Sequence, residues 1–80
     1  MDLQIVTPDA NLYSGEASMV EVPGTNGKFQ VLNNHAPIIS TLTKGQVRIK
    51  GADNKEQSFA IDGGVIEVLN NKVTVLAESA

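Results

Sequence analysis

Closely spaced turn residues limit the folds that this chain can adopt more than any other feature of its sequence. Apolar runs of about five residues, rich in valine and isoleucine, alternate with clusters of Gly, Asn, Asp and Pro. β-Branched residues favour strands, and the residues of these clusters favour turns. Because the turns recur too often for a helix of ordinary length, the sequence predicts an all-β chain with no convincing helix.

The runs predict about nine short strands at the regular spacing of a β-sandwich or barrel. Residues 46–50 alternate most cleanly, which predicts that Val47 and Ile49 point inward. The chain, residues 1–80, has no repeat or linker and is expected to form a single domain. Four glycines are predicted to occupy turns or bulges: Gly24, Gly27, Gly63 and Gly64.

Three runs break the alternation expected of a strand with one wet face: Ile38–Ile39, Val65–Ile66 and Val68–Leu69. Apolar residues on both faces of a strand indicate that both faces are covered. The inner face would meet the other sheet, and the outer face would need another cover, most simply another subunit. The alternative is a twisted corner of the sandwich, where both sides are partly buried. The sequence leaves both interpretations open.

The composition of the chain argues against several classes of function. The chain has no cysteine and one histidine, His35, which argues against disulfides and metal sites. Its net charge of −3, without a basic stripe, argues against nucleic-acid binding. No apolar run approaches the roughly 18 residues of a membrane span. A chain this short buries only about 60% of its unfolded surface, so a protein partner is the expected source of further stabilisation.

Catalytic motifs are also missing from the sequence. The glycines of residues 24–28 do not form a phosphate loop, because Phe29 follows Lys28 where serine or threonine is required. A single histidine without a nucleophile-elbow motif does not indicate a catalytic triad. We therefore expect no enzyme activity and no cofactor. His35 is interpreted as a loop residue that hydrogen-bonds nearby backbone or contacts a partner.

Several short motifs follow one another along the chain: Leu-Tyr-Ser-Gly at 12–15, Val-Pro-Gly-Thr-x-Gly at 22–27, His-Ala-Pro at 35–37, Lys-Gly at 44–45 and Ile-x-Gly-Gly-Val-x-Glu-Val at 61–68. In this order they resemble the N-terminal domain of the epsilon subunit of bacterial ATP synthases, called delta in mitochondria. The resemblance implies a ten-stranded antiparallel β-sandwich of two sheets. It also implies a non-catalytic rotor subunit that joins the gamma subunit to the membrane ring of c subunits, coupling proton flow to ATP synthesis at the cytoplasmic face of the bacterial inner membrane.

The resemblance also suggests which residues make these contacts. Contacts with gamma would come from the stretch around the His-Ala-Pro motif: His35, Ile38, Ile39 and Ser40. Contacts with the polar loops of the c ring would come from Thr7, Pro8 and Lys28. The family often has an acidic residue at the position of Lys28, so we hypothesise that the cognate ring loop offers an acid or a carbonyl group. Membrane association would occur only through the complex.

Longer members of the family continue into two C-terminal helices, which can block ATP hydrolysis and in some members bind ATP. This sequence stops before them, so we expect no helical inhibitory element and no ATP binding, and a naturally short form is favoured over a shortened chain. The alternative function is a small β-sandwich scaffold that binds proteins unrelated to ATP synthase. A biotinyl-type carrier is disfavoured, because Lys55 is not flanked by methionines. Co-purification of a gamma subunit separates these possibilities.

Overall fold

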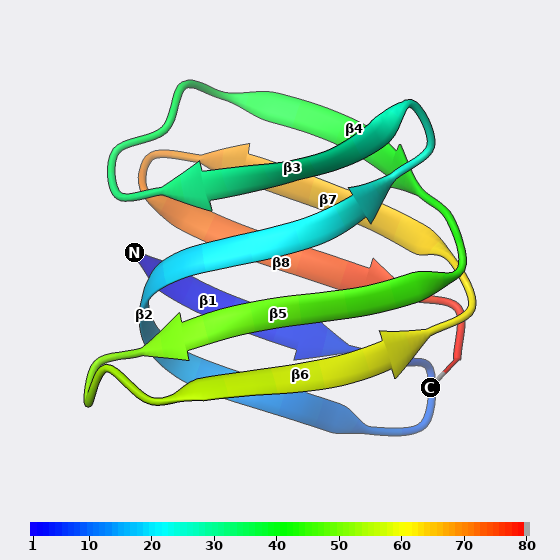
Figure 1. Cartoon of the computed structure of the whole chain (residues 1–80), viewed down its shortest axis with the longest axis horizontal. Coiled ribbons are helices and arrows are strands. Elements are labelled where there is room, and N and C mark those ends of the chain that lie inside the picture. The colour runs from blue at the N-terminus through cyan, green and yellow to red at the C-terminus, as the bar shows by residue number, and fades with distance from the viewer. Residues whose placement is uncertain (80) are drawn as a thin grey trace.

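The computed structural model describes residues 1–79, and every regular element in that range is a strand. Figure 1 shows the strands running roughly along the longest axis of a molecule that measures 26 × 23 × 18 Å. The eight strands are β1 (Asp2–Val6), β2 (Asn11–Gly24), β3 (Gly27–Leu32), β4 (Ile38–Leu42), β5 (Gly45–Gly51), β6 (Glu56–Ile61), β7 (Gly64–Leu69) and β8 (Lys72–Ala77). The all-β prediction is confirmed.

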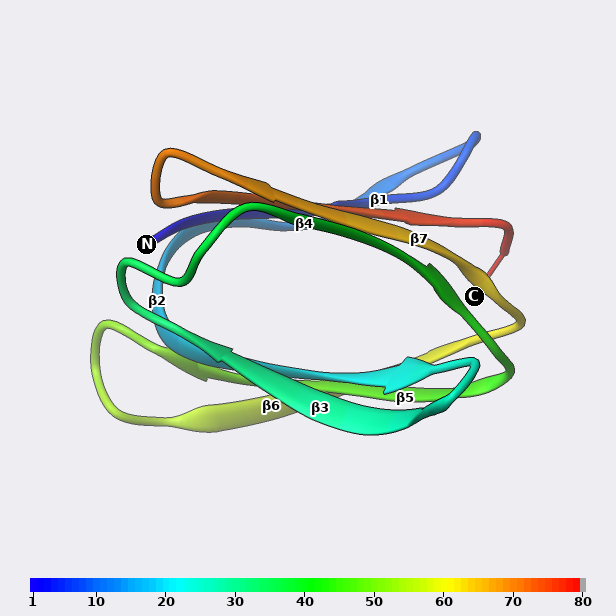
Figure 2. The ribbon, with the colours of Figure 1, turned by 90° about the horizontal axis from the view of Figure 1, so that it is seen from above.

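The strands form two packed layers, which Figure 2 shows edge-on. One layer contains β4, β7, β8 and β1, hydrogen-bonded in that order, with the first half of β2 beyond β1. The other layer contains β3, the second half of β2, β5 and β6. A further bridge pairs Gly24 at the end of β2 with Leu42 at the end of β4, which joins the layers along one side. The predicted sandwich of two sheets is confirmed.

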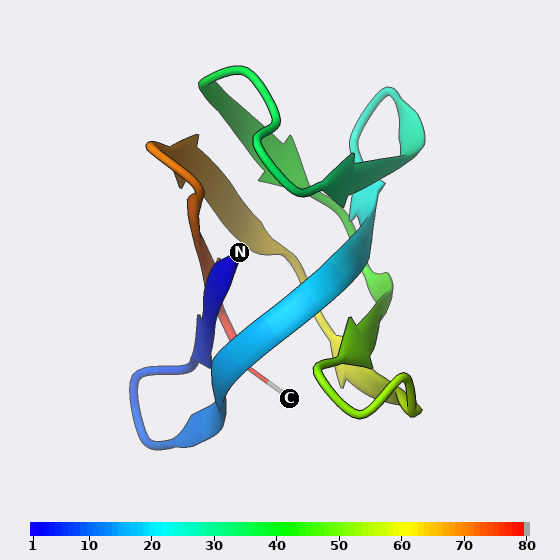
Figure 3. The ribbon, with the colours of Figure 1, turned by 90° about the vertical axis from the view of Figure 1, so that its left-hand side faces the viewer.

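Strand β2 explains why the structure has eight strands and not the nine expected from the runs, while the family likeness implied ten. The segments 12–14 and 19–22, expected as separate strands, belong to one strand of 14 residues. Its pairing with β1 ends at Glu16, and its pairing with β5 begins at Ala17 with a register irregularity before Met19. Such an irregularity bends a strand without ending it. Figure 3 shows β2 crossing from one layer to the other.

The pairing of β1 with β8 is parallel, whereas the family likeness implied antiparallel strands throughout. Leu3 lies opposite Val73, and Ile5 lies opposite Val75. Strand β8 enters this position from a tight turn at Asn70–Asn71, beside the start of β1, where the amide of Asp2 donates to the carbonyl of Asn71 at 3.0 Å. Both strands therefore leave the same end of the sandwich and run in the same direction.

The core between the layers is aliphatic, and most of its large side chains are β-branched. Val47 and Ile49 of β5 point inward and are fully buried, as their alternation predicts. Among the residues that the structure describes, no polar or charged side chain is buried. The other fully buried large side chains are Leu3, Ile5, Val20, Val22, Val31, Ile61, Ile66, Val68, Val73 and Val75. Hydrophobic burial, without buried polar side chains, therefore holds the two layers together in this core.

The four predicted turn glycines lie at strand ends. Gly24 and Gly27 flank the turn between β2 and β3, while Gly63 precedes β7 and Gly64 begins it. A Cβ atom on Gly64 would lie 2.2 Å from the carbonyl oxygen of Leu76, and one on Gly24 would lie 2.7 Å from that of Gly27. Close backbone approach therefore requires glycine at both positions.

The outer face of the layer that contains β3, β2, β5 and β6 carries a network of charged and polar side chains around Arg48. Arg48 Nη2 donates to Glu21 Oε2 at 2.6 Å, and Nη1 donates to Glu56 Oε1 at 3.0 Å. The side-chain amide of Gln30 also donates to Glu21, at 3.4 Å. The hydrogen bond from Arg48 holds the pKa of Glu21 below its ordinary value of 4.5 and raises the pKa of Arg48. The charged groups of Arg48, Glu21 and Glu56 therefore have partners of opposite charge within the chain.

Replacement of Ile49 by alanine tests the core. Ile49 is fully buried, and Ile→Ala at such positions costs about 2–5 kcal/mol of unfolding free energy. The matched control is Ile39→Ala, because 71% of that side chain is exposed and its loss should cost less than about 0.5 kcal/mol. Urea denaturation of the three proteins measures both values. Equal losses would show that the structure assigns the inner and outer faces wrongly.

The Arg48–Glu21 contact predicts a dependence of stability on pH. The lowered pKa of folded Glu21 means that its stabilising contribution is present above 4.5 and is lost as the pH falls through the folded pKa. Arg48→Met should therefore lower the urea midpoint at neutral pH, with a difference from the parent that shrinks towards about pH 2. Midpoints measured across this range test the contact. A difference that stays constant across the range would contradict it.

Candidate protein-interaction surface

Most of the large exposed apolar side chains lie on the outer side of β4, β7 and β8. Ile39, Leu76 and Leu69 are 71%, 53% and 49% exposed, and Val65 is half-buried. The strand register brings them onto one surface: Thr41, Val65 and Leu76 lie across from one another, and Ile39 lies across from Glu67. We call Ile39, Val65, Leu69 and Leu76 the outer apolar face.

The exposures decide between the two interpretations of the non-alternating runs. Ile66 and Val68 point into the core, whereas Val65 and Leu69 point outward. These segments are therefore ordinary strands with apolar side chains on both faces. They are not corners that bury both sides, because Ile39 and Leu69 remain open to water. The outer face is uncovered in the isolated chain, and exposed apolar surface of this kind is typical of protein-interaction sites.

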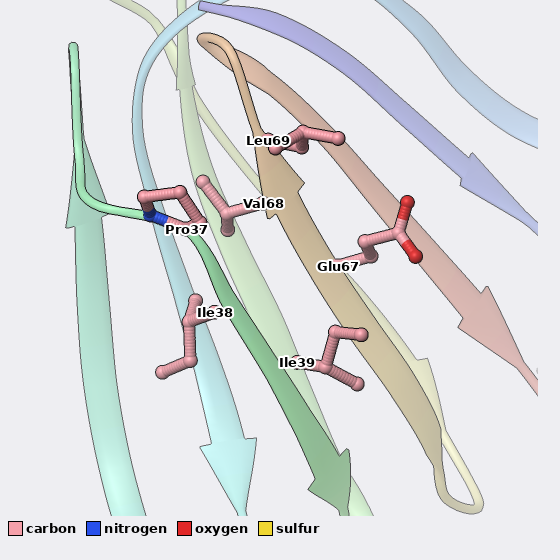
Figure 4. A pocket seen from close by; sticks show the side chains of 6 residues that line it. All are labelled: Pro37, Ile38, Ile39, Glu67, Val68 and Leu69. Carbon is pink, nitrogen blue, oxygen red and sulfur yellow. The ribbon is translucent and has the colours of Figure 1, made fainter.

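An open hollow of about 380 Å³ lies at the margin of the outer apolar face, where β4 begins and β7 ends. Figure 4 shows its six lining side chains on and beside these two strands: Pro37, Ile38, Ile39, Glu67, Val68 and Leu69. Five of them are apolar. The only charged group is the carboxylate of Glu67. The hollow can receive an apolar side chain from a partner, and it has no constellation of polar groups that would support catalysis.

The four residues predicted to contact gamma lie in different surroundings. His35 lies in the loop between β3 and β4, where its Nδ1 is 2.7 Å from the carbonyl oxygen of Ala36. Ile39 points outward, but Ile38 and Ser40 are half-buried on the opposite side of β4. Ser40 donates to the carbonyl oxygen of Thr41 at 3.3 Å. Of the four, Ile39 alone belongs to the outer apolar face.

The three predicted c-ring contacts lie in or beside two turns at the other end of the sandwich. Thr7 and Pro8 form part of the turn between β1 and β2, in which the hydroxyl of Thr7 accepts from the amide of Ala10 at 3.0 Å. Lys28 is exposed immediately after the turn between β2 and β3. Figure 1 shows both turns at the right-hand end, whereas the loop that carries His35 is at the left-hand end. His35 thus lies at the end opposite both turns, whereas Ser40 precedes Thr41, whose carbonyl oxygen accepts from the amide of Thr25 in the turn before Lys28 at 3.1 Å.

Sequence reasoning left Val65 and Leu69 open between a partner contact and a sandwich corner, and it did not single out Leu76. The broken alternation of their runs pointed to Val65 and Leu69. Leu76 sits in the run Val73–Ala77, where a single outward leucine is indistinguishable from a core residue without the register of β8. Within residues 1–79, no group of histidine and carboxylate side chains could hold a metal ion. The described part of the chain also contains no helix that could cross a membrane.

Comparison with known proteins gives a family match over the whole chain. The model of the β-sandwich domain of the ATP synthase delta/epsilon chain matches residues 1–80. The ATP synthase epsilon chain of Chlorobaculum tepidum is 47% identical over 76 residues, which cover 95% of this chain and 86% of the relative. That of Brevibacillus brevis is 42% identical over 80 residues, and there this chain spans 61% of the relative's length.

Solved structures share the fold at much lower identity. A chain of the Euglena gracilis mitochondrial ATP synthase superposes with a TM-score of 0.87 at 17% identity, covering 96% of this chain and 49% of the other. A chain of the Tetrahymena thermophila mitochondrial enzyme gives a TM-score of 0.83 at 17% identity, with 99% and 63% covered. Both likenesses support the β-sandwich architecture.

The family match and the sequence relatives agree with the ordered motifs, and they argue against a scaffold unrelated to ATP synthase. The chain therefore belongs to the ATP synthase delta/epsilon family, as the β-sandwich domain of an epsilon subunit.

Proposed function

We propose that this domain is a non-catalytic rotor subunit that links the gamma subunit to the c ring and couples proton flow to ATP synthesis. The observation that carries this proposal is the exposed outer apolar face of a domain that belongs to the ATP synthase delta/epsilon family. The domain would be peripheral at the cytoplasmic face of the bacterial membrane, held there only by the complex. The Tetrahymena chain comes from a structure described as a central stalk and c ring, which supports this placement.

The gamma subunit would cover the outer apolar face. Ile39, Leu69 and Leu76 offer large apolar side chains close together, as the centre of a protein interface requires. The hollow beside Pro37 offers a position for an anchoring side chain of gamma. His35 would contribute at the edge of this contact, from the loop that precedes β4. Ile38 would line that hollow, and Ser40 would support the contact from the other side of the strand.

The c ring would meet the opposite end of the sandwich through polar contacts. Thr7, Pro8 and Lys28 lie in or beside exposed turns, which suits contact with the polar loops of a ring. Lys28 carries the charge in this group, so its partner on the ring would be an acidic side chain or a carbonyl oxygen. The two partners would then bind at separate places on one small domain, which is the arrangement that a coupling element needs.

Substitution of Ile39 by aspartate tests the gamma contact. A charge in the centre of an apolar interface should raise the dissociation constant for the organism's gamma subunit by about 10-fold or more. The change should leave the urea midpoint nearly unaltered, because Ile39 is exposed in the isolated domain. Ala60→Asp, on the exposed outer side of β6, is the matched control and should bind normally. Normal binding by Ile39→Asp would exclude this face as the docking site.

Reversal of the charge at Lys28 tests the ring contact. Lys28→Glu should weaken binding to the detergent-solubilised c ring of the same organism, because it places a negative charge against an acidic or carbonyl partner. Lys55→Glu makes the same change in the loop between β5 and β6, at the other end of the molecule, and serves as the control. Surface plasmon resonance at two salt concentrations separates the charge effect from loss of folding. Tighter binding by Lys28→Glu would refute the proposed partner chemistry.

A further inference from the structure

Glu67 occupies the middle of the outer apolar face and is its most unusual member. On β7 it lies two residues from both Val65 and Leu69, with its side chain on the same surface. Across the sheet its neighbours are Ile39 on β4 and Thr74 on β8. Figure 4 shows its side chain extending from β7 over β8, on the side away from Ile39. Three of these four neighbours are apolar, and the carboxylate is tolerated beside them because it is exposed to water.

No side chain within residues 1–79 forms an ion pair with Glu67. The cation nearest in register on this surface is Lys72, which lies opposite Leu69 and therefore diagonal to Glu67. Lys72 has Asp2 as its direct neighbour on β1. The other outer face differs, because Arg48 there bridges Glu21 and Glu56. The negative charge of the outer apolar face is left uncompensated within the chain.

Any partner that covers this face removes water from Glu67. A carboxylate that loses water without gaining a partner is strongly unfavourable, whereas a paired carboxylate is tolerated. We propose that the covering surface of the gamma subunit carries an arginine or lysine side chain that pairs with Glu67 beside Ile39, Val65 and Leu69. This inference rests on the proposed function, since it specifies the chemistry of the gamma surface. Arginine fits better, because its planar guanidinium can bind both carboxylate oxygens while lying against apolar side chains.

The test uses the neutral isostere Glu67→Gln and the organism's purified gamma subunit. The variant keeps the size of the side chain and leaves the partner's cation without its counter-charge. The dissociation constant should rise by about 10-fold or more, as for other desolvated charge pairs that lose one member. The salt dependence of binding should also become shallower. Glu56→Gln makes the same chemical change on the opposite outer face and should bind gamma as the parent does.

The outcomes separate this inference from the docking proposal. Weaker binding by Glu67→Gln, with Glu56→Gln unchanged, supports the cation on gamma. Unchanged or tighter binding by Glu67→Gln, while Ile39→Asp still disrupts the complex, overturns the cation and leaves the docking face in place. If neither Glu67→Gln nor Ile39→Asp alters binding, both the cation and the docking face are wrong. If the parent chain does not bind gamma at all, the proposed function fails and this inference fails with it.

Discussion

The fold depends on one strand that is hydrogen-bonded in both layers. The first half of β2 pairs with β1, and its second half pairs with β3 and β5. Small sheets are marginally stable alone and need a covered apolar face. Because β2 belongs to both layers, backbone hydrogen bonds connect them in addition to the shared core. Val20 and Val22 of the same strand are fully buried in that core, so one segment contributes to both sources of stability.

The interior and the exterior of this domain serve different purposes. Inside, aliphatic residues of similar size fill the space, and nothing in their arrangement is specific to a function. Outside, the two layers differ in charge. One presents a compensated network around Arg48, and the other presents the outer apolar face with the single carboxylate of Glu67. The asymmetry between the outer faces therefore gives the domain a preferred side for a partner.

Much of the fold could be predicted from the sequence, because alternation and turn residues act locally. The inward direction of Val47 and Ile49 is one example, and the turn at Asn70–Asn71 is another. The continuity of β2 could not be predicted, since a bend between layers and a turn between strands have similar local sequences. The parallel pairing of β1 with β8 depends on contacts between the two ends of the chain, about which periodicity carries no information.

The interaction surface was only partly predictable for a related reason. Family likeness pointed to the segment around Ile39 as a partner contact, and non-alternation indicated that Val65 and Leu69 need cover or lie at a corner. Neither the family likeness nor the broken alternation shows on which side of β4 a side chain lies. The prediction therefore groups Ile38 and Ser40 with Ile39, although their side chains lie on the opposite side of the strand. The register with β7 and β8 was needed to add Leu76 and to place Glu67 among its apolar neighbours.

The direction of the strands has a mechanical consequence. The strands run from the end that carries the loop of His35 to the end that carries the turns of Thr7 and Lys28 (Figure 1). Hydrogen bonds between antiparallel strands lie perpendicular to the strands. A load applied between the two ends would shear many of these bonds at once and would not unzip them singly. Such an element resists stretching far better along its strands than across them, and it can therefore pass a force from end to end with little deformation.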